Sequence, residues 1–251
     1  MNIEILKESY HKTLSKVNSE DFEFIEDKYS GVFLPYYFEE YEEANPKIMI
    51  VGRETSGWNT NNNKNTLKRI IDKNANNSLN DIIEESLSRY SWHLRNSPDG
   101  KIKTKHSSKF QHYYNKVSKE LNISPKSMIY ANLFAWDYNK KSPLERSDVE
   151  LQKITDISLE LLATQIKFFK PNYIIFATGY SRVDPLIKKL FEIHFDGHET
   201  IRVNPKKIWE FKAANTKCFR IAHPRAQHGH AAYRKEVIEI IKKSSNFGGH
   251  A

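Results

Sequence analysis

The chain has 251 residues, enough for one domain of generous size, and 39% of them are hydrophobic, which excludes a disordered chain. Its single cysteine, Cys218, excludes an intrachain disulfide and any four-cysteine zinc or iron–sulfur site. No apolar run approaches the roughly 20 residues that span a bilayer, and the N-terminus lacks the apolar block of a signal peptide. We therefore expect a cytoplasmic protein that does not bind membranes.

Lysine and arginine number 39 against 31 aspartates and glutamates, which gives a formal net charge of +8. Such a surplus favours a polyanionic partner, because neutralising phosphates releases their counterions. The charge is uneven: the stretch up to Glu43 is rich in acids, whereas Arg95–Lys119 and the last fifth of the chain are basic. This indicates a polarised molecule with one side facing DNA; the alternative is a set of solvated faces.

Strands and helices are expected to alternate along the chain. Short, nearly continuous runs of β-branched and aromatic residues are typical of strands buried on both faces of a parallel sheet, and apolar residues at helical spacing lie between them. In chain order we expect a helix at Glu4–Val17, a strand at Lys47–Val51, helices at Leu79–Tyr90 and Phe110–Leu121, a strand at Met128–Ala131, a helix at Asp148–Phe169, a strand at Tyr173–Ala177, a helix at Pro185–Phe191, a strand at Cys218–Ala222 and a helix at Ala231–Lys243.

Two segments are predicted to be insertions or long loops, since neither can form a core by itself. One is the asparagine-rich Asn59–Asn77. The other is Arg95–Lys109, which holds the turn signal Ser97–Gly100. Four lysines in this second segment are candidates for contacts with DNA phosphates: Lys101, Lys103, Lys105 and Lys109.

Polar clusters follow the predicted strands at the end where ligands of parallel sheets bind. After the first strand, Gly52–Trp58 places the carboxylate of Glu54 on a tight loop, where glycines let backbone N–H groups approach a phosphate or a base. The alternative is a structural turn with a solvated glutamate. After the second strand, Asn132 offers an amide that can pair with a base edge; the alternative is an asparagine that caps its own loop.

After the last strand, the sequence delivers His223-Pro224 and then a loop rich in hydrogen-bonding groups. A neutral histidine here can donate to an oxygen that gains charge during bond cleavage. The three histidines His223, His228 and His230 could also suggest a metal site. Zinc ligand sets usually use a tighter pair with a further cysteine, histidine or carboxylate, so we expect no metal and no other cofactor.

The order of these clusters resembles the uracil-DNA glycosylase superfamily. Ile48–Gly57 is similar to its first motif, and Met128–Trp136 is similar to its second strand, which ends in a base-reading asparagine. Leu159–Tyr180 resembles the helix, Lys-Pro step and third strand of the family, and Ala222–Arg234 resembles its closing His-Pro motif. The loop after Gly52 lacks the family's usual proline.

The resemblance implies a three-layer α/β/α fold with a central, mainly parallel four-stranded sheet. It implies one domain over residues 1–251, with an N-terminal helical extension over about 1–45 and an insertion over about 59–120. By position, Glu54 falls on the residue that activates water, Asn132 on the base-reading asparagine and His223 on the histidine that stabilises the departing base. The Arg225–His230 loop falls where the family inserts a wedge into the duplex.

From these matches we expect a monomeric DNA glycosylase that flips a damaged or modified base, uracil or another modified pyrimidine, out of single- or double-stranded DNA and hydrolyses its N-glycosidic bond. Glu54 and His223 are the expected catalytic groups. The expected base-binding residues are Gly52, Arg53, Trp58, Asn132 and Trp136, with Phe134 and Tyr138 as further stacking candidates; for each aromatic residue the alternative is core packing. The expected DNA contacts are the four lysines above together with Arg225, Gln227, His228 and Arg234.

Three other functions fit parts of the pattern. The altered first motif fits a non-catalytic DNA- or nucleotide-binding module of the same fold. A hydrolase of free nucleotides or nucleosides would use the same pocket without a basic groove. A glycosylase acting on bulky modified bases of foreign, phage DNA would fit the departures from the family pattern. A plain interaction domain leaves the polar residues at the strand ends unexplained.

Overall fold

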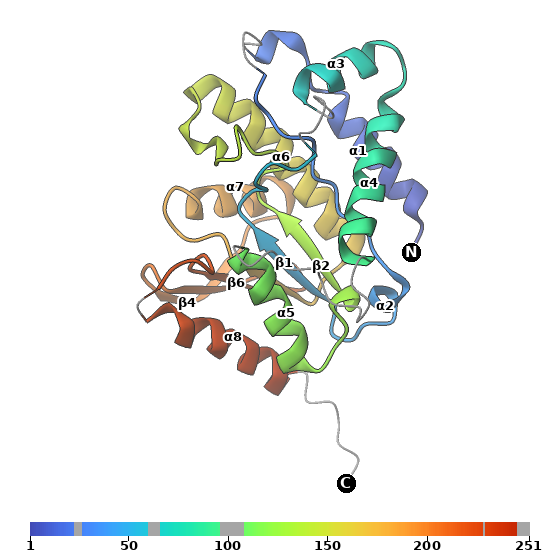
Figure 1. Cartoon of the computed structure of the whole chain (residues 1–251). Coiled ribbons are helices and arrows are strands. Elements are labelled where there is room, and N and C mark those ends of the chain that lie inside the picture. Colours follow the sequence, from blue (N-terminus) through green and yellow to red (C-terminus); the bar gives the residue numbers. More distant parts are fainter. Residues whose placement is uncertain (23–26, 60–65, 96–107, 228, 245–251) are drawn as a thin grey trace. The chain divides into compact units, whose positions relative to one another are not determined.

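The computed structural model describes residues 1–22, 27–59, 66–95, 108–227 and 229–244, with the side chains of residues 93–95 excepted. Over these residues the chain is an α/β protein with a single mixed sheet of six strands; Figure 1 shows the sheet between helices. It divides into two compact units. Unit 1 comprises Met1–Tyr36, Arg53–Trp92 and Ala131–Phe169, and unit 2 comprises Tyr37–Gly52, His93–Tyr130 and Lys170–Ala251.

The sheet has the strand order β2-β1-β3-β6-β5-β4. Strands β1, β3 and β6 run parallel to one another, with Ile50 beside Ile175 and Ile175 beside Phe219. Strands β5 and β4 follow β6 in antiparallel order. The bounds are β1 Ile48–Gly52, β2 Met128–Asn132, β3 Tyr173–Phe176, β4 Glu199–Asn204, β5 Ile208–Ala213 and β6 Thr216–Ile221.

The four predicted strands are confirmed as β1, β2, β3 and β6, but the prediction of a four-stranded, mainly parallel sheet was wrong. Strands β4 and β5 form a hairpin that adds two antiparallel strands to the sheet. Strand β4 is an edge strand whose residues are almost all exposed, so it lacks the continuous apolar run by which the other strands were recognised. Strand β5 alternates apolar Trp209 and Phe211 with charged Glu210 and Lys212, which is typical of an antiparallel strand.

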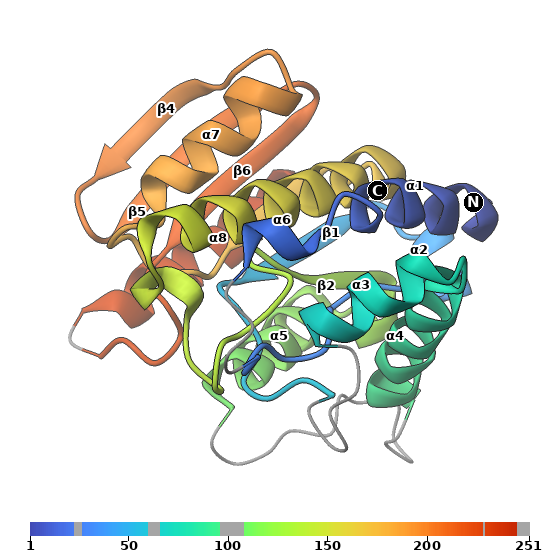
Figure 2. The ribbon, with the colours of Figure 1, turned by 90° about the horizontal axis from the view of Figure 1, so that it is seen from above.

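Helices of unit 2 lie against opposite faces of this sheet. On one face, Phe191 of α7 (Asp184–His194) packs edge-on against Phe176 of β3 and Phe211 of β5. On the other face, Arg202 of β4 bonds to Glu236 of α8 (His230–Ser244). Figure 1 shows α7 on one side of the β4–β6 strands and α8 on the other, and Figure 2 shows α7 lying over these strands. Unit 2 also contains α5 (Lys109–Leu121) and the short α2 (Glu39–Glu42).

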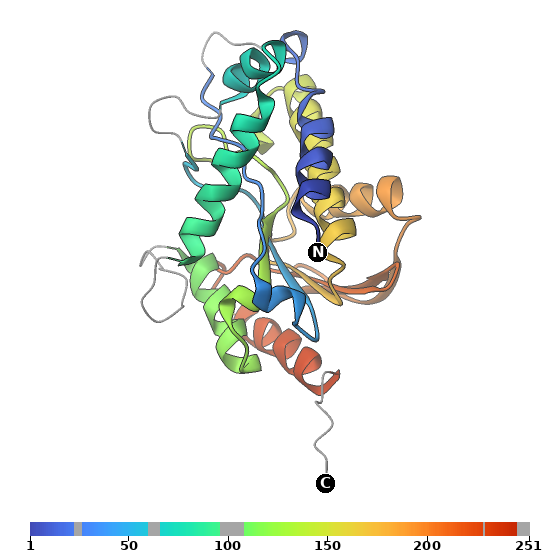
Figure 3. The ribbon, with the colours of Figure 1, turned by 90° about the vertical axis from the view of Figure 1, so that its right-hand side faces the viewer.

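Unit 1 consists mainly of helices and long loops. Helix α1 (Ile3–Leu14) begins at Asn2, whose side chain accepts from the N–H of Glu4, and packs against α6 (Asp148–Phe169) (Figure 3). The other helices are α3 (Leu67–Ala75) and α4 (Leu79–Arg95), of which the part up to Trp92 belongs to unit 1. One-turn 3₁₀ helices cover Ser19–Asp21, Pro125–Ser127 and Pro143–Glu145, the second of them in unit 2.

The six predicted helices are confirmed, with ends that differ by a few residues. Asn59–Asn77 was predicted to be an insertion or a long loop; helix α3 lies inside it, so it is not a loop throughout. Most of the other predicted loop, residues 96–107, lies outside the described residues. The N-terminal segment supplies buried Leu6, Tyr10 and Leu14 to unit 1, so it is part of that unit's core. Among the described residues, no helix combines the length and apolarity needed to cross a membrane.

Candidate functional site

The loop that follows β1 is shaped by the buried carboxylate of Asp137. Its Oδ2 accepts from the hydroxyl of Thr55 at 2.6 Å, from the N–H of Gly57 at 2.8 Å and from the N–H of Trp58 at 3.4 Å. Its Oδ1 accepts from the N–H of Lys140 at 2.9 Å. Because both oxygens are satisfied, a fully buried carboxylate is tolerated here. Asp137 therefore fixes the backbone of the loop directly beyond Glu54.

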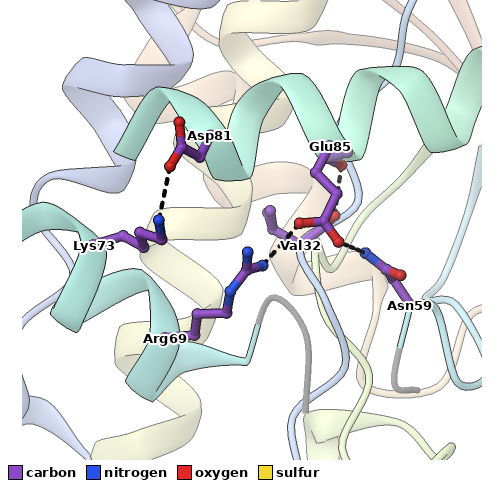
Figure 4. A network of polar contacts seen from close by, with 7 residues as sticks. Val32, Asn59, Arg69, Lys73, Asp81 and Glu85 are labelled. Atoms are coloured by element: carbon purple, nitrogen blue, oxygen red, sulfur yellow. Dashed lines mark hydrogen bonds and ion pairs between the residues drawn. The ribbon is translucent and has the colours of Figure 1, made fainter. Parts of the chain in front are cut away.

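A second network holds the far end of the same loop (Figure 4). Asn59 has a positive φ of 50° and donates its amide to Oε1 of Glu85 on α4. Arg69 of α3 donates to the other oxygen of Glu85 at 2.9 Å. Lys73 and Asp81 form a further ion pair between these two helices. Helices α3 and α4 thus act together as a support for the loop.

Glu54 lies two residues beyond the end of β1, on this supported loop. Its carboxylate accepts from Nε of Arg53 at 2.7 Å, and 12% of its side chain is exposed. The carbonyl of Arg53 accepts from the N–H of Phe134, at 2.9 Å, which ties the start of the loop to the segment after β2. Arg53 and Glu54, both predicted site residues, are therefore in direct contact, and the carboxylate of Glu54 reaches the surface beside the guanidinium of Arg53.

Asn132 is the last residue of β2 and is buried. The aromatic residues after it are enclosed: Phe134 and Trp136 are both 0% exposed. The expectation that Trp136 stacks on a base is corrected by this burial, because neither face of its ring is open. For these two residues the alternative, core packing, holds.

Two further stacking candidates are already in contact with neighbouring side chains. Trp58 is 8% exposed, packs edge-on against Phe33 with ring centres 4.9 Å apart, and has Arg89 over its ring at 5.5 Å. The ring of Tyr138 meets Tyr29 edge-on and carries the guanidinium of Arg146 at 4.0 Å. Both rings pack against other side chains of unit 1, so only a limited part of each ring surface is left to contact a ligand.

His223 follows β6 in unit 2, and its tautomer is set by its own loop. The backbone N–H of Arg225 donates to Nδ1 of His223 at 3.1 Å. Because Nδ1 is an acceptor, a neutral imidazole carries its proton on Nε2 and can donate from there. Gly179, with φ 83°, lies against it: a Cβ at Gly179 would be 3.7 Å from the Cβ of His223.

The predicted DNA contacts are only partly described. Lys101, Lys103, Lys105 and His228 lie outside the described residues. Lys109 begins α5, and Arg225 and Gln227 are exposed. Arg234 of α8 donates to the carbonyl of Ala226 at 3.2 Å, and burial lowers the pKa of its guanidinium from the ordinary value. Arg234 therefore holds the backbone of the loop after Pro224 at Ala226.

The predicted residues are divided between the units. Arg53, Glu54, Trp58, Asn132 and Trp136 belong to unit 1, while Gly52, His223, Arg225, Gln227 and Arg234 belong to unit 2. Within unit 2, Gly52 ends β1 and His223 follows β6, and because these strands are parallel both residues lie at the same edge of the sheet. In the described part of the chain, no group of three or more histidine, cysteine, aspartate or glutamate side chains is placed to hold a metal ion.

Asp137 and Glu85 were not recognised from the sequence. Asp137 stands only five residues beyond Asn132, so the strand-end rule that identified Asn132 indicated its neighbourhood. Three of the four hydrogen-bond partners of its carboxylate, however, lie about 80 residues earlier in the chain. Glu85 sits on the polar face of a predicted helix, where a solvated glutamate is the usual case.

No family model matches the chain, and no curated protein matches its sequence.

Proposed function

We propose that this protein is a DNA glycosylase with a three-layer α/β/α fold, which hydrolyses the N-glycosidic bond of a damaged or modified base and leaves an abasic site. The observation that carries the proposal is a pair of groups that follow parallel strands of one sheet. A carboxylate, Glu54, comes after β1, and an imidazole that can donate from Nε2, His223, comes after β6.

These two groups suit the charges that develop when a glycosidic bond breaks. The sugar becomes positive and the departing base becomes negative. Glu54 would stabilise the sugar and position a water molecule for attack, and the Nε2–H of His223 would donate to an oxygen of the base. Asn132 would read the base edge. The net charge of +8 suits a polyanionic substrate.

Incubation with modified DNA followed by hot alkali tests the proposal, because abasic sites break under alkali and a sample without the protein shows the breaks that the modified base itself produces. A panel of oligonucleotides carrying uracil, hypoxanthine, oxidised bases and bulky cytosine derivatives covers the substrate classes that fit the sequence. At least one of them is expected to be cleaved. If none is cleaved while the protein still binds DNA, the chain is a binding module and not a glycosylase.

On the substrate that is cleaved, Glu54→Gln and His223→Ala should each slow abasic-site formation by about 10²- to 10³-fold, since each removes one electrostatic contact to the transition state. Binding to the same oligonucleotide should change little. Lys212→Gln, an exposed substitution on β5 of unit 2, is the control and should leave the rate unchanged. Full activity in both site variants would contradict the assigned roles.

A further inference from the structure

Helix α4 carries the most exposed tryptophan of the protein. All four tryptophans lie in the described part of the chain. Trp92 is 63% exposed, whereas Trp58, Trp136 and Trp209 are 8%, 0% and 3% exposed. A single exposed apolar residue is unremarkable by itself, so the surroundings of Trp92 decide whether it has a role.

Arg89 stands one helical turn before Trp92, and residues three apart share a helix face. Arg89 is exposed and its guanidinium lies 5.5 Å from the ring centre of Trp58. Because Trp58 belongs to the loop that carries Glu54, this contact places the Arg89–Trp92 face of α4 beside that loop. A cation and an open aromatic ring thus lie on one side of it.

A second cation, Lys140, lies against Ser56 and Gly57 of the same loop, and Lys141 follows it in the chain. A Cβ added at Gly57 would be 3.2 Å from Cγ of Lys140, and the hydroxyl of Ser56 donates to the carbonyl of Lys140. Lys140 and Lys141 are both exposed. We call Arg89, Trp92, Lys140 and Lys141 the loop-side patch; all four belong to unit 1.

Among the described residues, three carboxylates that belong to the loop or bond to it are already engaged. Glu85 bonds to Asn59 and Arg69, Asp137 is fully buried with four donors, and Glu54 is paired with Arg53. The charged side chains of the patch itself, Arg89, Lys140 and Lys141, are all positive and exposed. The combination of a basic surface and an open aromatic ring is the one used to bind single-stranded nucleic acid, where cations follow the phosphates and the ring stacks on a base.

We propose that the loop-side patch binds a single strand of DNA, with Trp92 stacked on an unpaired base and with Arg89, Lys140 and Lys141 contacting phosphates. A single strand is specified because a surface tryptophan can stack only on a base whose face is open. The choice of DNA as the polyanion rests on the proposed function, and the patch would guide the strand toward the loop that carries Glu54.

Tryptophan fluorescence tests the stacking directly, with an unmodified oligothymidylate as the probe. Because the other three tryptophans are buried, acrylamide quenching reports mainly on Trp92. The oligonucleotide should quench the emission and protect it from acrylamide, and Trp92→Phe should abolish both changes. Trp92→Ala should weaken binding roughly tenfold, as expected for the loss of one stacked base. If the oligonucleotide binds while Trp92 stays fully accessible to acrylamide, the proposal is wrong.

The salt dependence of binding tests the three cations. The triple variant Arg89→Gln, Lys140→Gln, Lys141→Gln should flatten the slope of log affinity against log salt by about 2, since each single-strand phosphate contact contributes roughly 0.7. The matched control removes three exposed lysines of α1 and α6 in the same unit: Lys12→Gln, Lys153→Gln and Lys167→Gln. The control has the same net charge and should keep the slope; equal effects of the two triples would refute the patch.

The two proposals fail separately. Oligothymidylate contains no modified base, so its binding is measured without reference to base removal. Binding through the patch in a protein that leaves no abasic sites on the modified panel would sustain the patch and reject the glycosylase. Abasic sites formed by a protein whose binding is unaffected by the patch variants would reject the patch and sustain the glycosylase.

Discussion

At the scale of single residues, Asp137 is the group on which the candidate loop depends most. Its carboxylate accepts from three backbone N–H groups and one hydroxyl, which belong to Thr55, Gly57, Trp58 and Lys140. A buried charge is costly unless it is hydrogen-bonded. Here the same hydrogen bonds that satisfy the charge also fix the loop. Removing the carboxylate would therefore leave several buried donors without an acceptor at once.

Asp137→Ala should lower the free energy of unfolding by about 3 kcal/mol or more, because each buried donor left without a partner costs about 1–3 kcal/mol. Thr55→Val is the matched control: it removes one hydroxyl donor from the same carboxylate while nearly keeping its shape, and should cost about 1 kcal/mol. Urea unfolding measures both. A loss for Asp137→Ala no larger than that for Thr55→Val would show that the carboxylate does not hold the loop.

Sequence reasoning reached some site residues and missed others for a physical reason. Glu54, Asn132 and His223 stand directly after apolar runs, so the rule that ligands bind beyond the carboxyl ends of parallel strands identifies them. Asp137 and Glu85 act through partners far away in the chain, and no local pattern encodes that pairing. The burial of Trp136 was equally invisible, since an aromatic residue beside a strand end suits a core and a stacking site alike.

At the scale of elements, continuous apolar runs were the reliable signal. Strands β1, β3 and β6 are buried along nearly their whole length, and their sequences show it. Strand β4 contributes an exposed edge, and its sequence alternates too weakly to indicate a strand. Helix α3 is short and follows an asparagine-rich stretch, and only two of its residues, Leu67 and Ile70, are buried. Elements at the periphery of a fold carry less apolar patterning, so they are the ones that sequence analysis misses.

Helix α7 is fastened to the sheet by a buried ion pair. Nε and Nη2 of Arg220 on β6 lie 2.7 and 2.8 Å from the two carboxylate oxygens of Asp184, in the first turn of α7. The two side chains are buried unequally, with 2% of Arg220 and 30% of Asp184 exposed. The arginine therefore depends on its partner more than the aspartate does.

This asymmetry makes Asp184→Ala the more damaging of two substitutions. It leaves a buried guanidinium without its carboxylate, and breaking a buried pair from one side typically costs about 3–5 kcal/mol. Arg220→Met leaves a carboxylate that water can reach, so the loss should be smaller. The double variant should recover part of the loss, as measured by urea unfolding. A double variant as unstable as the sum of the two singles would show that the pair is not coupled.

At the scale of the whole molecule, the chain passes repeatedly between its two units. Each unit is assembled from three separate segments of sequence. Sequence reasoning predicted one domain over residues 1–251 and had no means to foresee this division, because the segments of each unit are distinguished by their contacts and not by their composition. Neither unit could be produced by cutting the chain once, because the middle segment of each unit is preceded and followed in the chain by segments of the other unit.

This interleaving predicts that the two units unfold together. When one unit opens, the loops that join the segments of the other lengthen, and closing longer loops costs entropy.

Cys218 reports on unit 2: it is fully buried on β6, and burial raises the pKa of its thiol, so thiol reagents should not reach it in the native protein. In a Trp92→Phe, Trp209→Phe variant, the remaining Trp58 and Trp136 report on unit 1. Thiol labelling and fluorescence should give one shared urea midpoint, whereas two separated midpoints would show that each unit is stable without the other.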